Sequence, residues 1–281
     1  MIRIDAHHHV WDLAVRDQPW TANLPALRRS FDLNDLAPEL ASAAIDATVV
    51  VQTVTTPAET PELLALADTS PLVAGVVGWV DLEAPDVADR LAELRGLPGG
   101  TALVGIRHQV QGERDLEWLD RASVRHGLAA VATAGLSYDL LVTPNQLPAA
   151  ISAARHTPDL RFILDHAGKP HIARGHIEPW ASLIASLAAL PNVAVKLSGL
   201  ATEASAQWTV GELQPYADTL LATFGSSRMM FGSDWPVSLL SAPYAETVAA
   251  AEQLLHGASA DELDAVFGGT AVGWYSLGEL V

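Results

Sequence analysis

Cysteine is absent from this 281-residue sequence, which excludes disulfide bonds and thiol catalysis. No apolar run approaches the length of a membrane span. The first residues also lack the basic segment followed by an apolar one that marks a secretion signal. We therefore expect a cytoplasmic protein with no membrane partner.

Basic residues are scarce as well. Sixteen lysines and arginines stand against 33 aspartates and glutamates, which gives a formal net charge of −17. A surface of this sign repels nucleic acids and anionic membranes, so neither is an expected partner. A small molecule is the expected partner, and even an anionic one is allowed, because a local cationic pocket can oppose the overall field. Self-association into a homo-oligomer stays open.

Short β-branched runs alternate along the chain with longer Ala- and Leu-rich segments of helical spacing. The short runs predict strands at Ile2–His7, Ala47–Thr53, Leu72–Val80, Ala102–His108, Leu128–Thr133, Arg161–His166, Val193–Ser198 and Arg228–Asp234. The longer segments predict helices at Leu33–Ala43, Pro61–Asp68, Ala84–Arg95, Glu113–His126, Pro144–His156, Ile177–Leu190, Thr209–Phe224, Pro243–Leu255 and Asp261–Tyr275.

Eight strand–helix units in a chain of this length predict a (β/α)8 TIM barrel with parallel strands. No linker, charge block or low-complexity run interrupts the pattern, so residues 1–281 are expected to form a single domain. The rival fold is an open doubly wound sheet. It is disfavoured because no Gly-x-Gly-x-x-Gly turn follows the first strand.

The first and last predicted strands both end in residues suited to chemistry. The first runs into His7, His8 and His9, and the last into Asp234. Because side chains alternate along a strand, His7 and His9 share a face and His8 points away as a structural residue. The histidines could instead be the remnant of a tag, and Asp234 could be a helix N-cap. If the two strand ends are neighbours, two histidines and a carboxylate meet where they can bind a divalent metal or activate water.

Polar residues follow most of the other predicted strands too. They are Gln52, Trp79 and Asp81, Arg107 and His108, Asp165 and His166, and Lys196 and Ser198. Only the fifth strand, predicted at Leu128–Thr133, ends without an ionisable group. Each residue alone could be a surface ion-pair partner, a cap or a satisfied core group. Together they predict an active site at the carboxyl ends of the strands, where barrel enzymes place their chemistry.

These motifs resemble the amidohydrolase superfamily, and within it the sugar-lactone hydrolase branch, typified by L-fucono- and L-rhamnono-lactone hydrolases. The resemblance runs nearly end to end. It rests on Asp5-Ala6-His7-His8-His9-Val10-Trp11-Asp12, Val51-Gln52, Gly105-Ile106-Arg107-His108, Leu164-Asp165-His166-Ala167-Gly168-Lys169-Pro170, Lys196-Leu197-Ser198-Gly199-Leu200, Thr202-Glu203 and Phe231-Gly232-Ser233-Asp234-Trp235-Pro236.

The resemblance implies that His7 and His9 are the first-strand histidine pair, His166 the sixth-strand histidine and Asp234 the eighth-strand aspartate. Two features depart from the superfamily pattern. Arg107 stands where two-metal members carry a bridging lysine or acid, and the fifth strand offers no histidine. A guanidinium repels a cation, so a two-metal centre is not expected. A single divalent ion, most simply zinc, could be held by His7, His9 and Asp234, and catalysis without metal stays open.

The implied reaction adds water to a lactone carbonyl and opens the ring to a hydroxy acid. Asp234 is expected to act as general base and then general acid, with His166 stabilising the developing charge. The residues expected to bind substrate are Arg107, Lys196, Gln52, His108 and Trp11, and Trp79 and Trp235 are equally candidates for pocket or core. Two alternatives remain: a metal-dependent decarboxylase of the same superfamily, and a binding barrel without catalysis.

Overall fold

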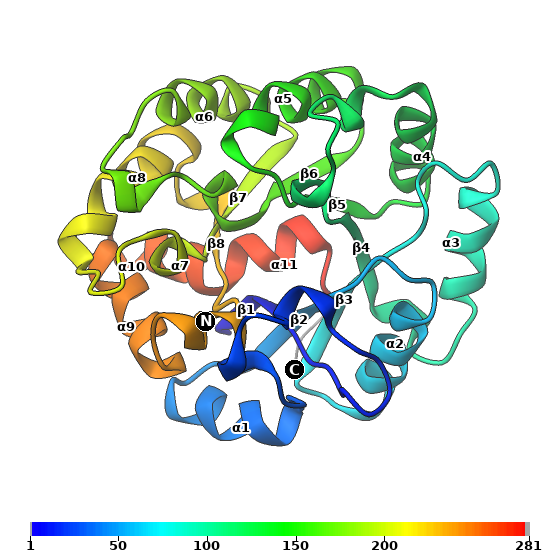
Figure 1. Cartoon of the computed structure of the whole chain (residues 1–281), viewed down its shortest axis with the longest axis horizontal. Coiled ribbons are helices and arrows are strands. Elements are labelled where there is room, and N and C mark those ends of the chain that lie inside the picture. Colours follow the sequence, from blue (N-terminus) through cyan, green and yellow to red (C-terminus); the bar gives the residue numbers. More distant parts are fainter. Residues whose placement is uncertain (1, 279–281) are drawn as a thin grey trace.

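Eight parallel strands follow one another around a single sheet in chain order. The computed structural model describes residues 2–278. The strands are β1 (Ile4–His8), β2 (Ala47–Val51), β3 (Val73–Gly78), β4 (Leu103–His108), β5 (Ser137–Leu140), β6 (Arg161–Leu164), β7 (Val193–Leu197) and β8 (Met229–Phe231). Each strand pairs in parallel with the next one along the chain, and the sheet curves into the predicted (β/α)8 barrel, with helices outside the strands (Figure 1).

The helices are α1 (Leu33–Ser42), α2 (Glu59–Thr69), α3 (Val87–Arg95), α4 (Ala122–Thr133), α5 (Leu147–His156), α6 (Trp180–Ala188), α7 (Leu200–Glu203), α8 (Val210–Phe224), α9 (Tyr244–Leu254), α10 (Ala260–Asp264) and α11 (Thr270–Tyr275). Figure 1 shows α11 lying across the centre of the ring of strands. Its Ala271 and Tyr275 belong to the same apolar cluster as Ile4, Val49 and Met230 of the strands. This last helix therefore helps to fill the inside of the barrel.

The prediction of a strand at Leu128–Thr133 was wrong. That segment is the end of α4, and the fifth strand lies a few residues later at Ser137–Leu140. Val124, Leu128 and Val131 are all buried, at the spacing of one helical face. A short Ala- and Val-rich run reads equally well as strand or helix, so this case had no clear sequence signal. The helix predicted at Glu113–His126 likewise begins only at Ala122.

The barrel closes between β8 and β1 through backbone just beyond the strand ends. The N–H of Asp234 donates to the His7 carbonyl at 2.8 Å, and the N–H of His9 donates to the Trp235 carbonyl at 2.7 Å. The residues expected to carry the chemistry are thus themselves part of the closing seam. Among the described residues, no helix combines the length and apolar character needed to cross a bilayer.

Candidate active site

The alternation predicted for the first strand holds. His8 is buried and its Nε2 lies 2.9 Å from the Thr48 hydroxyl, away from the other two rings. His7 and His9 point to the same side, with their Nε2 atoms 3.2 Å apart. The Nδ1 of His9 lies 2.7 Å from the Val51 carbonyl, which can only accept. His9 is therefore protonated on Nδ1, and the lone pair of its Nε2 faces the site.

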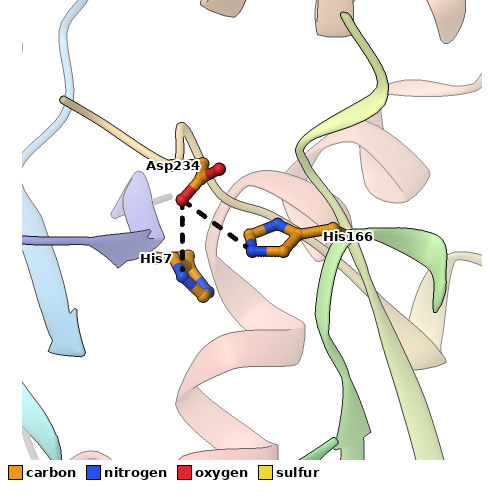
Figure 2. A group of neighbouring side chains, drawn as sticks. All are labelled: His7, His166 and Asp234. Atoms are coloured by element: carbon orange, nitrogen blue, oxygen red, sulfur yellow. Dashed lines mark ion pairs between the residues drawn. The ribbon is translucent and has the colours of Figure 1, made fainter. Parts of the chain in front are cut away.

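Asp234 and His166 reach this site from turns just after β8 and β6, as Figure 2 shows. Both adopt left-handed backbone, with φ of 59° and 50°, which is unusual for residues other than glycine. The Oδ1 of Asp234 lies 3.2 Å from His9 Nε2, 3.7 Å from His7 Nε2 and 3.8 Å from His166 Nε2. Three imidazoles therefore surround one carboxylate oxygen, in a geometry that the surrounding turns must hold against local strain.

Asp5, which was not among the predicted site residues, ties the two sides of the seam together. Its Oδ1 accepts the backbone N–H of Ser233 at 2.8 Å and that of His7 at 3.1 Å, and its Oδ2 accepts the Tyr244 hydroxyl at 3.1 Å. The carboxylate is fully buried, and burial raises its pKa above the ordinary value. Asp5 thus fixes the position of His7 relative to Asp234 without facing the site itself.

A buried charge network lies behind the histidines. Lys196 Nζ is 2.6 Å from Asp139, 2.9 Å from Asp165 and 3.0 Å from His7 Nδ1. Arg107 Nη1 is 3.0 Å from Asp165 and 3.2 Å from His7 Nε2. Both ring nitrogens of His7 face cationic donors, Nε2 facing Arg107 and Nδ1 facing Lys196, while Asp165 Oδ1 lies 3.2 Å from Nδ1 as a competing acceptor. The prediction that the fifth strand offers no ionisable group was wrong, because Asp139 on β5 pairs with Lys196.

Burial decides the charge states at this site. Desolvation lowers the pKa of His166 to about 4 and, with the charge of Lys196, holds the pKa of His7 well below its ordinary value. Burial alone would raise the pKa of Asp234, but the surrounding histidines, His166 first among them, outweigh burial and keep that pKa below its ordinary value. At neutral pH the site therefore holds an ionised Asp234 beside the neutral imidazoles of His7 and His166.

This set of donors fits one metal ion. Ligand atoms of His7, His166 and Asp234 lie within 4.8 Å of one another. His9 Nε2 and Asp234 Oδ1 are both acceptors at 3.2 Å, an arrangement that requires a proton or a cation between them. Imidazole nitrogens and a carboxylate suit zinc. Arg107, at 3.2 Å from His7 Nε2, takes the space and supplies the repulsion that would oppose a second ion.

A cavity of about 430 Å³ opens above this cluster. Of the predicted site residues, its walls include His9, Arg107, His166 and Asp234. The other predicted substrate-binding residues do not reach its walls. Lys196 and Gln52 are fully buried beneath it, where Gln52 donates to the Arg107 carbonyl at 3.1 Å.

The two aromatic candidates also lie away from the cavity. Trp11 is 6% exposed and donates its indole N–H to the Arg29 carbonyl at 2.7 Å. His108 stacks on Trp118 with ring centroids 4.2 Å apart, and its Nε2 lies 2.9 Å from Glu113. Trp79 donates to His108 Nδ1 at 3.1 Å and, like Trp235, is buried. These side chains therefore pack around the site and do not line the cavity.

The cavity walls include residues that the sequence did not single out for a role. Lys169 and Glu203 form an ion pair at 3.1 Å on the wall, and both fall within the quoted motifs. Trp20 lines the cavity as well. It lies in the 3₁₀ turn Pro19–Thr21 between β1 and α1, which is too short for a repeating sequence pattern to signal which way its side chain points.

Comparisons with known proteins identify the family of the chain. The amidohydrolase family model matches residues 4–277. L-fucono-1,5-lactonase of Burkholderia ambifaria is 41% identical over 280 residues, covering 98% of this chain and 96% of the relative. The enzyme of the same name from Burkholderia multivorans is 40% identical over 294 residues, covering 99% of this chain and 97% of the relative.

One solved structure is equally similar. The crystal structure of an amidohydrolase from Burkholderia multivorans, with bound zinc, is 38% identical and superimposes with a TM-score of 0.94, covering 99% of this chain and 100% of that one. The expectation of an enzyme of this family, built on a TIM barrel, is confirmed. The chain belongs to the amidohydrolase family.

Proposed function

We propose that this protein hydrolyses a sugar-derived 1,5-lactone, with L-fucono-1,5-lactone as the first substrate to test. The observation that carries the proposal is an ionised carboxylate, Asp234, on the wall of a cavity of about 430 Å³ and beside the neutral imidazoles of His7 and His166. Such a group can take a proton from water at neutral pH. The two lactonases that are about 40% identical over nearly the full chain supply the substrate class.

In the proposed reaction, water attacks the lactone carbonyl carbon while Asp234 accepts one of its protons. A carbon–oxygen bond forms, and the carbonyl oxygen takes the negative charge. As that charge returns, the bond between the carbonyl carbon and the ring oxygen breaks, and Asp234 delivers its proton to the departing oxygen. Arg107 and His166, both on the cavity wall, are the candidates to stabilise the developing charge.

We further propose that a single divalent ion, zinc by its donor set, binds at this cluster, with His7, His9 and Asp234 as ligands and His166 within reach. When bound, such an ion polarises a carbonyl or lowers the pKa of a water molecule. Elemental analysis of protein purified without added metal should give at most about one equivalent of metal per chain. The variant His9→Ala should contain less metal than the wild type. Two tightly held equivalents would contradict the proposal.

The deciding experiment is a panel of aldono-lactones assayed with a pH indicator, with and without a chelator. Release of one acid equivalent without carbon dioxide supports hydrolysis, and a chelator-sensitive rate supports the metal. Carbon dioxide release from an aromatic acid would support the decarboxylase alternative instead, and no turnover of any lactone would support a binding role. A cytoplasmic location stays a prediction.

A further inference from the structure

Trp20 is the tryptophan that faces the cavity. It is 37% exposed and lines the wall, whereas Trp11, Trp79 and Trp235, the tryptophans first considered for this role, are at most 9% exposed. Its indole is therefore accessible to a ligand in the cavity whose wall also carries Asp234.

The indole of Trp20 is held in place from below. Its Nε1 donates to Gln18 Oε1 at 2.8 Å, and the Gln18 amide donates in turn to the Thr53 hydroxyl at 2.8 Å. Gln18 is buried, and the Thr53 N–H donates to the Glu59 carboxylate at 2.9 Å, just beyond β2. Trp11 contacts the indole edge-to-face, with ring centroids 5.5 Å apart. Trp20 is thus tied to the barrel rim before any ligand arrives.

These contacts also decide what Trp20 offers to a ligand. Its single hydrogen-bond donor is already engaged by Gln18, so the surface it turns to the cavity is hydrocarbon and aromatic π-face. Leu24, Val237 and Leu240 extend this apolar lining. The same cavity carries the Lys169–Glu203 ion pair and Asp234, which can hydrogen-bond to hydroxyls.

An apolar surface combined with charged hydrogen-bond donors and acceptors is complementary to a polyhydroxylated ring, which has C–H surfaces as well as hydroxyls. We propose that Trp20 is a specificity-determining residue whose indole packs against the C–H face of the sugar lactone. This inference rests on the proposed lactone hydrolysis and deepens it, because it assigns the binding of the ring to a residue that takes no part in proton transfer.

The test compares three variants of Trp20 by steady-state kinetics on the best lactone of the panel. Trp20→Ala should raise KM about tenfold while kcat changes less than about threefold, because the lost contact serves binding of the ring in ground and transition states alike. Trp20→Phe should restore most of the affinity because it is flat and aromatic. Trp20→Leu should restore little, although it is apolar. Melting temperatures should show that all variants are folded.

Trp274→Ala is the matched control. Trp274 lies on α11, packs against the apolar cluster inside the barrel and donates its indole N–H to the Ser227 carbonyl at 3.3 Å, away from the cavity. This variant should leave KM unchanged. If Trp20→Ala does not fold, the comparison of Phe with Leu carries the test alone.

Three results would overturn the inference. One is an unchanged KM in folded Trp20→Ala, and another is equal rescue by Phe and Leu, which would make Trp20 a packing residue. Failure of the wild-type protein to hydrolyse any sugar lactone would overturn the proposed function, and this inference with it. An active wild-type enzyme with an unaffected Trp20→Ala variant would overturn the role of Trp20 alone.

Discussion

Asp234 shows how a single side chain is placed by its neighbours rather than by its own preference. Its left-handed backbone carries a cost of order 1 kcal/mol for a non-glycine residue, which the surrounding contacts must offset. The seam supplies two such contacts, the Asp234 N–H to the His7 carbonyl and the Ser233 N–H to Asp5. The strain is therefore stored where the proposed proton transfer takes place.

Replacing this carboxylate tests the mechanism most directly. Asp234→Asn should retain the fold and lose nearly all lactone turnover, because an amide cannot accept the proton of the attacking water. Since the pKa of Asp234 lies below its ordinary value, protonation of this group should not reduce kcat/KM of the wild type between pH 8 and 5. The measurement is a pH–rate profile of both proteins, with exposed Asp261→Asn as control. Near-normal turnover of Asp234→Asn would refute the assignment.

Arg107 was expected to contact substrate, yet most of its bonds go to the protein. Its guanidinium pairs with Asp165, His7 and the Gln52 carbonyl, and the side chain is 2% exposed. Without Arg107, the buried Asp165 would keep only Lys196 as a Lys or Arg partner, and a buried charge that loses part of its pairing destabilises the fold. The binding and structural roles are therefore joined in this residue, and a kinetic effect alone would not separate them.

We expect Arg107→Met to lower the free energy of unfolding by about 3–5 kcal/mol, because Asp165 loses a buried partner. The double variant Arg107→Met/Asp165→Asn should recover part of this loss. Arg90→Met, which breaks an exposed pair with Glu93, should cost no more than about 1 kcal/mol. Urea unfolding measures all three. If the single and double variants are equally unstable, the pair with Asp165 is not what Arg107 stabilises.

Among the secondary-structure elements, the turn between β7 and α7 lies directly against a site residue. Gly199 begins this turn at φ of 64°, and a Cβ added there would lie 2.8 Å from the His166 ring. Gly175, just after the turn Ile172–Arg174, has φ of 65° in the same left-handed region, but no atom of the described residues lies within 4 Å of an added Cβ. The two glycines share the backbone requirement and differ only in the crowding.

Alanine at these two positions should separate strain from displacement. Gly175→Ala should cost about 1 kcal/mol of stability and leave kcat/KM unchanged, because only the left-handed conformation is penalised. Gly199→Ala should have a similar conformational cost and also lower kcat/KM at least tenfold, because His166 must move. Thermal unfolding and kinetics on each variant check this. Equal activity in both variants would mean that the position of His166 is not critical.

The elements also show what could be predicted from the sequence. Seven strands were located because β-branched runs ended in polar residues, and strand alternation correctly separated His8 from His7 and His9. The fifth strand was missed because Leu128–Thr133 is apolar in both strand and helix spacing. Because that strand was missed, Asp139, the partner of Lys196, was missed as well. Trp20 could not be predicted, because the three-residue turn Pro19–Thr21 is too short to show a periodic pattern, and tertiary contacts decide where its side chains point.

The barrel as a complete structure depends on histidines that are buried without charge. Burial lowers the pKa of His8 to about 3 and that of His166 to about 4, and it also lowers that of His7. Asp139 acts in the opposite direction, because burial raises its pKa to about 6. A buried histidine whose pKa is lowered by folding makes the protein less stable as pH falls below the histidine's unfolded pKa, because the unfolded chain then binds the proton more tightly. A carboxyl whose pKa is raised by folding, such as Asp139, makes the protein more stable as pH falls below about 6, because the folded chain then binds the proton more tightly.

His8 isolates one of these contributions, because it lies outside the cavity with only the Thr48 hydroxyl as side-chain partner. Between pH 6.5 and about 4 the unfolded chain binds a proton at this position and the folded one does not, so wild-type stability should fall by up to about 1.4 kcal/mol per pH unit on its account. His8→Gln should remove that share of the slope, whereas His126→Gln, on the exposed side of α4, should not. Urea unfolding at several pH values measures the difference. An unchanged slope in His8→Gln would mean that His8 binds its proton in the folded barrel as readily as in the unfolded chain.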